Sequence, residues 1–271
     1  MEGEHPAQLQ FYPQHPIITN IIKQSPDISQ GVNTGGAGDQ GIMYGYATDE
    51  TPEMLPKAIV LVHRLTKGLE ELRRSGQIPW LKPDGKSQVT MGDGAIKTIL
   101  VSCQHAETVS QDEIRRTLIK KLIRPLVDNP VRIEILVNPT GKFVRGGFAA
   151  DTGVTGRKIM VDTYGGLIPH GGGSFSGKDP TKVDRSAAYM CRRIAVDLLK
   201  KHHAQQVKTK LVYAIGVKDP VMGVAEIDGE IGPIEGYDVT PRGIINFLQL
   251  DRPIYAETAK WGHHGRGFPW G

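Results

Sequence analysis

The sequence predicts an α+β fold in which helices cover one face of mostly antiparallel sheets. The order strand, helix, strand occurs twice, first over residues 96–137 and again where a helix at 184–201 precedes a strand at 211–217. Hairpins are added to these two units, whereas a doubly wound parallel sheet needs a regular alternation of strands and helices. We therefore expect an arm and two α+β regions, over residues 1–23, 24–150 and 151–271.

The composition is that of an ordinary globular protein. The 271 residues are 39% hydrophobic and 23% charged, which is enough apolar chain for a core divided over two or three subdomains. The formal charge of +4 is small and the basic residues form no long run, so charge alone does not indicate nucleic acid. No apolar run is long enough to span a membrane, and the N-terminus lacks a basic-then-apolar signal pattern. We expect a cytoplasmic protein that binds neither nucleic acid nor membranes.

The arm and the segment that follows it have an irregular pattern. Prolines at positions 6, 13 and 16 interrupt the arm. Residues 23–41 are polar and glycine-rich without periodicity, and a loop of this length inside a compact domain is usually a lid or a binding loop. Within it, the glycine cluster at 36–41 is a weak signal, and an inert turn is the alternative.

The next block combines a helix with a turn. Residues 53–74 carry apolar side chains at helical spacing and predict an amphipathic helix. Residues 79–90 predict a proline-punctuated turn that enters a strand, and Asp84 with Gly85 suits a tight turn that projects Lys86. On this block alone, a solvated surface lysine is the more common explanation of Lys86.

Turn and cap signals organise the rest of the first region. Residues 92–94 predict a hairpin into a strand at 96–102. Residues 110–113, Ser-Gln-Asp-Glu, form a capping box at the start of the next helix. The strand predicted at 131–137 alternates at first, so one of its faces should be buried.

A series of glycine-rich loops follows. Residues 138–147 and 151–158 are punctuated by glycine, and both loops carry cations. Six glycines then fall between Gly165 and Gly177. Glycine at this density is unfavourable in the interior of a helix or strand, so the stretch predicts a backbone with positive φ or in close approach to a ligand.

The last of these loops leads into charged residues and a helix. Lys178, Lys182 and Asp184 precede apolar residues at helical spacing. Exposed backbone N–H groups, lysine charge and a helix N-terminus together favour phosphate. Asp184 either caps the helix through its carboxylate or holds a magnesium ion that bridges phosphate oxygens. A flexible surface loop with a capped helix explains any one of these features, but together they favour a polyphosphate ligand.

The remaining signals are weaker. Residues 220–241 are rich in glycine and acids with little periodicity, and 244–250 is a short apolar segment. Cys103 and Cys191 fit no metal spacing, and the position of Cys191 on the apolar face of the 184–201 helix predicts a buried thiol. The tail contains residues that are typical of metal binding or base stacking but are explained better by packing or surface positions: Trp261, His263, His264 and Trp270.

Several motifs extend along most of the chain, from Gln24 onward: 36–41 with Gly45 and Tyr46, Asp84 with 86–90, 153–166, 213–217, 252–270 and, as the longest and most distinctive, Gly171–Ser186. With these motifs the chain resembles the S-adenosylmethionine synthetase (methionine adenosyltransferase) family. The strongest match is Gly171–Ser186, and motifs this long, in the order of the family, are highly specific.

The resemblance implies adenosyl transfer. In this family the sulfur of methionine attacks the ribose C5′ of ATP and displaces the whole triphosphate, which is then hydrolysed to phosphate and diphosphate. The resemblance also implies Mg²⁺ and K⁺ as cofactors and ATP and L-methionine as substrates. This agrees with the predicted polyphosphate site, because a leaving triphosphate develops negative charge that fixed cations and magnesium stabilise.

The resemblance implies site residues by position. Asp184 is the implied metal ligand, and residues 24–39 are the implied mobile gate over the site. The implied catalytic residues, which bind the phosphates, are Lys86, Arg157, Lys158 and Lys178. The implied ATP-binding residues also include Asp84, Phe143 against adenine, Val144, Asp151 and Ser174. The implied methionine-binding residues are Gln24, Asp39, Asp151 and Lys182.

The N-terminal arm departs from the family pattern. Family members carry a Glu-Gly-His-Pro-Asp-Lys motif that supplies a histidine near the leaving phosphate and a second magnesium-binding aspartate. The arm holds only an echo of it, Glu2–Pro6, with one residue inserted and Ala7 in place of the aspartate, so His5 is the candidate histidine. The region between Val217 and Ile244 is also shorter than in the family and is expected to lack a helix.

These matches and departures leave two functions open. One is an active synthetase, and the other is a non-catalytic nucleotide-binding or regulatory subunit related to it. The retained charged residues favour the enzyme, whereas the missing N-terminal groups favour the subunit. The resemblance implies a homodimer or tetramer with the site at a subunit interface, or assembly with a full-length paralogue.

Overall fold

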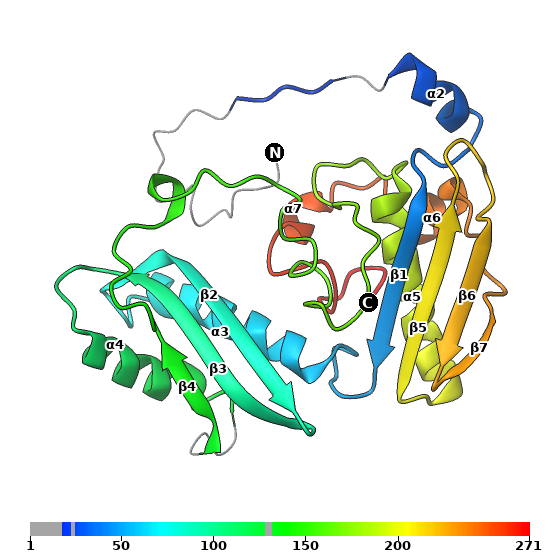
Figure 1. The fold of residues 1–271 in the computed structure, drawn as a ribbon. Helices are drawn as coiled ribbons and strands as arrows, with labels where there is room; N and C mark the ends of the chain where they lie inside the picture. Colours follow the sequence, from blue (N-terminus) through cyan, green and yellow to red (C-terminus); the bar gives the residue numbers. More distant parts are fainter. Residues whose placement is uncertain (1–17, 23–24, 128–131) are drawn as a thin grey trace. The chain divides into compact units, whose positions relative to one another are not determined.

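The computed structural model describes residues 18–22, 25–127 and 132–271, which form two compact units (Figure 1). Among the described residues, unit 1 contains 18–22, 25–56 and Val154–Gly271, and unit 2 contains Lys57–Gly153. The stretch 25–56, which the sequence pattern groups with the first region, therefore belongs to the unit of the second region.

Unit 1 contains a four-stranded antiparallel sheet in the order β1 (Gly41–Thr48), β5 (Gln206–Tyr213), β6 (Met222–Ile227) and β7 (Glu230–Pro233). Helix α5 (Val183–His202) packs against this sheet (Figure 1). The approach is close because a Cβ on Gly45 of β1 would collide with the backbone of Cys191 and Arg192. Cys191 is fully buried, as the sequence predicts, and burial raises the pKa of its thiol to about 12.

The core of unit 1 joins α5 to the C-terminal tail. Trp270 is fully buried and stacks on Tyr189 of α5, with ring centroids 3.9 Å apart. His263 is also buried, and its Nδ1 lies 2.7 Å from the Tyr189 hydroxyl. These contacts confirm packing as the role of His263 and Trp270. Helices α6 (Pro241–Leu248) and α7 (Tyr255–Thr258) complete this part of the unit.

Unit 2 is built on a three-stranded sheet in the order β2 (Leu81–Gly92), β3 (Ala95–His105) and β4 (Glu134–Val137). β2 and β3 form an antiparallel hairpin, whereas β4 is parallel to β3. Helix α3 (Lys57–Arg74) and helix α4 (Gln111–Leu118), with its π-helical continuation η1 (Ile119–Ile123), supply apolar side chains to the core. The buried core includes Leu65, Ile99, Ile114, Leu118 and Ile123.

The two units confirm the predicted α+β class, and several local predictions hold. Asp93 and Gly94 have φ of 52° and 73°, the positive values that a two-residue hairpin turn requires. The Ser110 hydroxyl accepts a hydrogen bond from Glu113 N at 3.2 Å and so caps α4. Helix α3 begins at Lys57 rather than at 53, because Pro56 disfavours helical backbone in the residue before it.

Other local predictions are wrong. Asp84 and Gly85 do not form a tight turn but lie within β2, where the pairing with β3 shifts register between Leu81 and Gly85. Residues 26–33 form helix α2 (Pro26–Asn33) instead of an extended loop, with Pro26 in the first turn, where its lack of an N–H costs nothing. β5 ends at Tyr213, four residues before the predicted strand end.

The region from 220 to 241 is more regular than its composition indicates. It contains the hairpin of β6 and β7, joined by Asp228 and Gly229 with φ of 48° and 96°. An Asp-Gly pair between alternating residues is a hairpin signal that could have identified it. The apolar segment at 244–250 belongs largely to α6.

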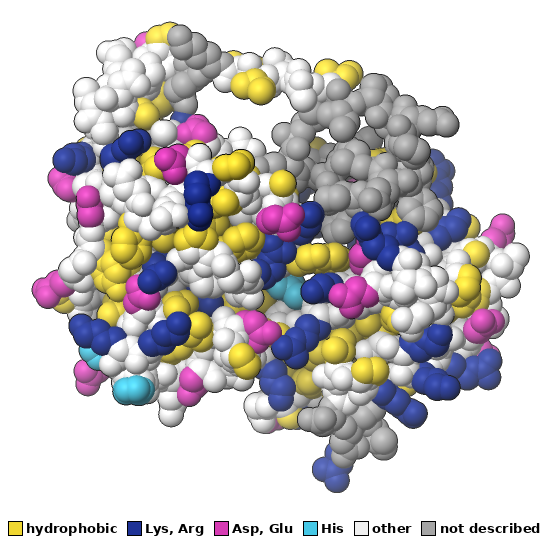
Figure 2. Space-filling model, turned by 180° about the vertical axis from the view of Figure 1, so that it is seen from behind, with side chains coloured by type: hydrophobic (Ala, Val, Ile, Leu, Met, Phe, Trp, Pro, Cys, Tyr) yellow, Lys and Arg dark blue, Asp and Glu magenta, His cyan; other side chains and the backbone are white. Residues whose placement is uncertain are grey.

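The surface carries charges of both signs. Basic and acidic side chains are interspersed over the face shown in Figure 2, in keeping with a net charge of only +4. No described helix combines the length and the apolar character needed to cross a bilayer.

Candidate functional site

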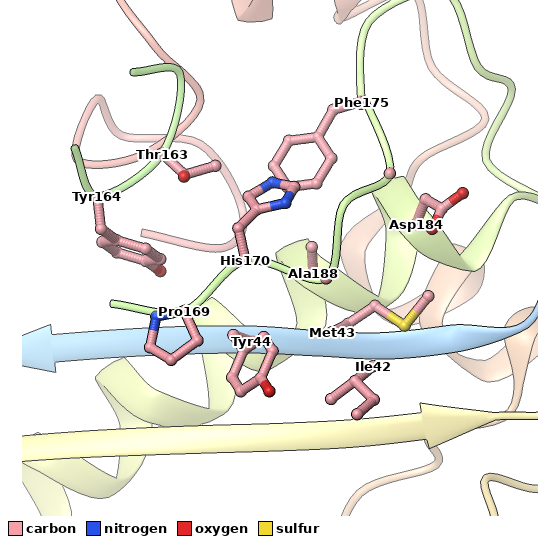
Figure 3. A pocket seen from close by; sticks show the side chains of 12 residues that line it. Ile42, Met43, Tyr44, Thr163, Tyr164, Pro169, His170, Phe175, Asp184 and Ala188 are labelled. Carbon is pink, nitrogen blue, oxygen red and sulfur yellow. The ribbon is translucent and has the colours of Figure 1, made fainter. Parts of the chain in front are cut away.

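The glycine-rich loop of unit 1 lies against β1 and the first turn of α5 (Figure 3). Gly165, Gly166, Gly172 and Gly177 have positive φ, as the sequence predicts for part of this stretch. At Gly171 a Cβ would collide with the carbonyl oxygen of Ile42 in β1. These positions therefore allow the loop backbone to run close to the helix and the strand.

Asp184 lies where this loop meets the helix. It is in the first turn of α5, and a Cβ on Gly173 would collide with its carboxylate. The N-cap residue is Lys182, and no side chain caps it, so the structure does not support Asp184 as a cap. Instead, the Asp184 carboxylate accepts a hydrogen bond from Lys178 Nζ.

The charge of Asp184 is set by opposing influences. Burial raises the pKa of its carboxyl above the ordinary 3.8, the ammonium of Lys178 opposes this rise, and the neighbouring carboxylate of Asp39 adds to it. Asp39 and Asp184 are therefore close enough to influence each other. A cation or phosphate-bound metal nearby would favour the charged form of Asp184.

Lys182 also lies in this part of unit 1. Its Nζ is 4.0 Å from Asp179 Oδ2, and it would be 3.4 Å from a Cβ on Gly38, next to Asp39. Residues around Gly38 are held in place because Ala37 exchanges backbone hydrogen bonds with 216–217 at 2.8 and 2.9 Å. The structure thus brings together four residues that the sequence separates into two motifs: Asp39, Lys178, Lys182 and Asp184.

Arg157 and Lys158 are exposed in the turns that precede the glycine-rich loop. Gly156, just before them, lies beside Ser174, because a Cβ there would be 2.9 Å from Ser174 Cβ. A Cβ on Gly177 would similarly be 3.9 Å from Thr155 Cγ2. The segment that carries these two cations therefore lies alongside the end of the glycine-rich loop, close to Lys178 in sequence.

A small, open pocket lies beside Asp184 (Figure 3). His170 lines it, stacks on Phe175 at 5.6 Å between ring centroids, and accepts a hydrogen bond from Gly172 N through Nδ1 at 2.9 Å. Burial lowers the pKa of His170, and the charge of Asp184 opposes this effect. His170 is not among the residues predicted from the sequence, although its position directly before three glycines is a signal.

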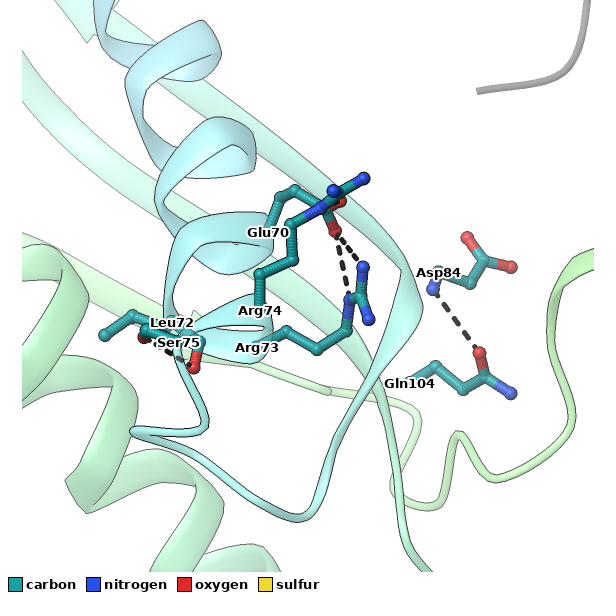
Figure 4. Close-up of polar contacts among 7 residues, drawn as sticks. All are labelled: Glu70, Leu72, Arg73, Arg74, Ser75, Asp84 and Gln104. Atoms are coloured by element: carbon teal, nitrogen blue, oxygen red, sulfur yellow. Dashed lines mark hydrogen bonds and ion pairs between the residues drawn. The ribbon is translucent and has the colours of Figure 1, made fainter. Parts of the chain in front are cut away.

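Unit 2 contains three of the residues predicted to bind ATP, Asp84, Phe143 and Val144. Asp84 Oδ2 accepts a hydrogen bond from Gly147 N at 2.9 Å. Gln104 accepts from Asp84 N at 3.3 Å (Figure 4), and its amide donates to the Val144 carbonyl at 3.1 Å. Asp84, Phe143 and Val144 are therefore held around the end of β3.

Of the other predicted site residues, two are exposed in unit 2 and two lie outside the described residues. Lys86 is exposed in β2 opposite Ser102 of β3. Asp151 is exposed, and its Oδ1 accepts a hydrogen bond from Gly153 N at 3.0 Å. Gln24 and His5 lie outside the described residues.

The side chains at this junction suit magnesium better than a metal that needs all of its ligands from the protein. The described residues contain no group of three or more His, Cys, Asp or Glu side chains arranged to hold a metal. Asp184 supplies one carboxylate, and magnesium is commonly held by one or two carboxylates together with substrate phosphates. Asp184 therefore fits Mg²⁺ bound jointly with a polyphosphate.

Comparisons with known proteins match both parts of the chain. Residues 34–143 match the family model of the S-adenosylmethionine synthetase central domain, and residues 145–271 match that of the C-terminal domain. The chain is 47% identical over 281 residues to S-adenosylmethionine synthase from Desulfosudis oleivorans, with 94% of this chain and 72% of the relative covered. It is also 47% identical over 288 residues to S-adenosylmethionine synthase from Thermus thermophilus, with 94% and 73% covered. The chain belongs to the S-adenosylmethionine synthetase family.

Proposed function

We propose that this chain synthesises S-adenosylmethionine from ATP and L-methionine, with release of phosphate and diphosphate. The observation that carries the proposal is the meeting of Lys178, Lys182, Asp39 and Asp184 where the glycine-rich loop enters α5. Lys178 and Asp184 beside the helix N-terminus suit a magnesium–triphosphate group, and Lys182 and Asp39 lie next to them, where methionine would bind. The names of the relatives give independent support for the same reaction.

The proposed chemistry is a displacement at carbon. The sulfur of methionine attacks C5′ of the ribose, the C5′–O bond breaks, and the triphosphate leaves with the bonding electrons. Lys86, Arg157, Lys158 and Lys178 would stabilise the negative charge that develops on the leaving oxygen, which lowers the barrier because this charge is larger in the transition state. Mg²⁺, held by Asp184, would neutralise further phosphate charge and assist hydrolysis of the triphosphate.

The two substrates need different recognition groups. For ATP, the candidates besides these cations are Asp84, Phe143, Val144, Asp151 and Ser174. For methionine, the ammonium of Lys182 suits the carboxylate, and the carboxylates of Asp39 and Asp151 suit the amino group. Gln24 is a further candidate for methionine, and residues 24–39 are the candidate gate.

The oligomeric state is part of the proposal. We expect a homodimer or tetramer, which light scattering coupled to gel filtration would measure. Assembly with a full-length paralogue is the other arrangement, and it would appear as restored activity when the two chains are mixed.

The decisive test is product formation by the purified chain. It would be incubated with ATP, L-methionine, MgCl₂ and KCl, and S-adenosylmethionine and released phosphate would be measured by chromatography and a phosphate assay. The synthase from Thermus thermophilus is the positive control, and omission of methionine or chelation of magnesium should abolish product. ATP binding without product would instead support the non-catalytic nucleotide-binding subunit.

A further inference from the structure

The segment that carries Phe143 and Val144 continues the β3–β4 pair after the backbone ladder ends. The parallel pairing stops at Val137, opposite Val101. Asn138 then uses its side chain, with Oδ1 accepting from Cys103 N at 2.8 Å and Nδ2 donating to Cys103 O at 3.1 Å. Asn138 is buried and has φ of 43°, a value that residues other than glycine rarely adopt, so its contacts with Cys103 hold the backbone in this conformation.

His105, the last residue of β3, bonds to both backbone polar groups of Phe143. His105 N donates to the Phe143 carbonyl at 3.0 Å, and Phe143 N donates to His105 Nε2 at 3.0 Å. The adjacent Gln104 donates to the carbonyl of Val144. The side chains of Asn138, Gln104 and His105 therefore extend the contact between the two segments beyond the ladder, to Phe143 and Val144.

The tautomer of His105 follows from its partners. Nδ1 lies 2.8 Å from the carbonyl oxygen of Ala106, which can only accept, so Nδ1 carries the proton. Nε2 is then an acceptor, in agreement with the Phe143 N–H that points to it and with the Gln111 amide 3.5 Å away. His105 is 1% exposed, so no solvent molecule substitutes easily for a lost bond.

We propose that His105 is a positioning residue for adenine recognition, acting through the backbone of Phe143. The proposal rests on the proposed function and on the packing of Phe143 against adenine that the family resemblance implies. Nε2 of His105 fixes where the Phe143 backbone lies and therefore where its ring meets the base. The contact of Phe143 would be with the nucleoside part of ATP. Its loss should therefore weaken the binding of ATP and leave the binding of tripolyphosphate, which has no base, unchanged.

Two substitutions separate the acceptor from the rest of the ring. Asn places its amide near the position of Nδ1 and offers no acceptor at Nε2, whereas Gln reaches the position of Nε2. H105N should raise the KM for ATP about tenfold, as expected for loss of one buried hydrogen bond, without changing tripolyphosphate hydrolysis. H105Q should restore the KM for ATP to within about threefold of the original chain. H202N, at the exposed end of α5, is the matched control and should change neither.

Measuring the equilibrium binding of ATP and of tripolyphosphate distinguishes failure of the His105 proposal from failure of the proposed function. If the original chain binds ATP but forms no product, the same comparison of H105N with H105Q is made by binding alone. Equal weakening of both ligands in H105N and H105Q, or an unchanged ATP affinity in H105N, overturns the inference about His105. Failure of the original chain to bind ATP overturns the proposed function together with it.

A second variant guards against simple unfolding of H105N. Q104M removes two hydrogen bonds at the neighbouring position, the one to Val144 O and the one from Asp84 N, and retains an unbranched side chain of similar size. Q104M should weaken the binding of ATP but not that of tripolyphosphate, as H105N does. Its circular dichroism spectrum should be that of the original chain. Loss of tripolyphosphate binding in Q104M as well would contradict the proposal.

Discussion

The ammonium of Lys178 donates a hydrogen bond to the carboxylate of Asp184 and so joins the end of the glycine-rich loop to the first turn of α5. The two side chains are 28% and 11% exposed, so water screens the pair only in part. Asp39 faces the same carboxylate. Substitutions at this junction therefore test the proposed site more directly than substitutions of exposed cations.

Removal of the Lys178 charge should abolish most of the activity. K178A is expected to lower kcat/KM for S-adenosylmethionine formation at least about 100-fold, the effect of losing one donor to a developing negative charge. K178R should retain intermediate activity because it keeps the charge with a different shape. The control is K200A, since Lys200 is exposed at the other end of α5. Activity of K178A above half that of the original chain would contradict the assigned role.

A methyl group at Gly173 should disturb the metal ligand without removing any charge. The new Cβ would collide with the Asp184 carboxylate, so that side chain must move. G173A is expected to lose at least about tenfold in activity and to need more magnesium for half-maximal rate. The matched control is G232A, because Gly232 in β7 has open space around its Cβ position. An unchanged magnesium dependence in G173A would argue against Asp184 as a ligand.

Unit 1 should lose stability in acid through His263. Burial, with smaller contributions from Arg185 and Arg266, lowers the pKa of His263 from 6.5 to about 3. Below pH 6.5 the unfolded chain binds a proton that the folded chain excludes, so stability is complete above pH 6.5 and falls as the pH decreases toward 3. The slope should approach about 1.4 kcal/mol per pH unit.

Urea titrations at several pH values between about 7 and 4, followed by tryptophan fluorescence, would measure this slope. H263Q removes the titrating group and should make the dependence shallower by close to one proton, whereas H202Q, at an exposed histidine, should not. Identical slopes for H263Q and the original chain would show that the imidazole of His263 does not drive the acid transition.

The cap of α4 should contribute measurably to the stability of unit 2. S110A removes the hydroxyl that accepts from Glu113 N and should lower the free energy of unfolding by about 1 kcal/mol. S110D supplies another side-chain acceptor and should stay within about 0.5 kcal/mol of the original chain. The measurement is the urea midpoint at constant m-value, and equal destabilisation by both substitutions would exclude the cap as the cause.

Features that depend on neighbours in sequence were predictable. The Asp93-Gly94 turn and the Ser110 cap need only a few adjacent residues, and both are present. Lys178 and Asp184 are six residues apart, so the loop-to-helix motif is enough to bring their side chains into contact.

Features that depend on distant partners were missed or wrong. Asp84 and Gly85 resemble a turn, but Gln104 and Gly147 bind Asp84 from remote segments and keep it within β2. The proposed role of His105 depends on its hydrogen bond with Phe143, 38 residues further along the chain, and no local sequence pattern indicates that contact. The β6–β7 hairpin was hidden by its glycine and acid content, although its Asp-Gly pair was a usable signal.

The pairing of Gly41 with Tyr213 joins two strands of unit 1 that the whole of unit 2 separates along the chain. During translation, residues 57–153 leave the ribosome as one continuous stretch with its own core, while β1 has already emerged and must wait for β5. Closing so long a loop is slow, because its entropic cost precedes any contact that repays it. The nascent chain therefore carries an unmatched strand edge from the synthesis of β1 until that of β5, and chaperone dependence should be greatest in that interval.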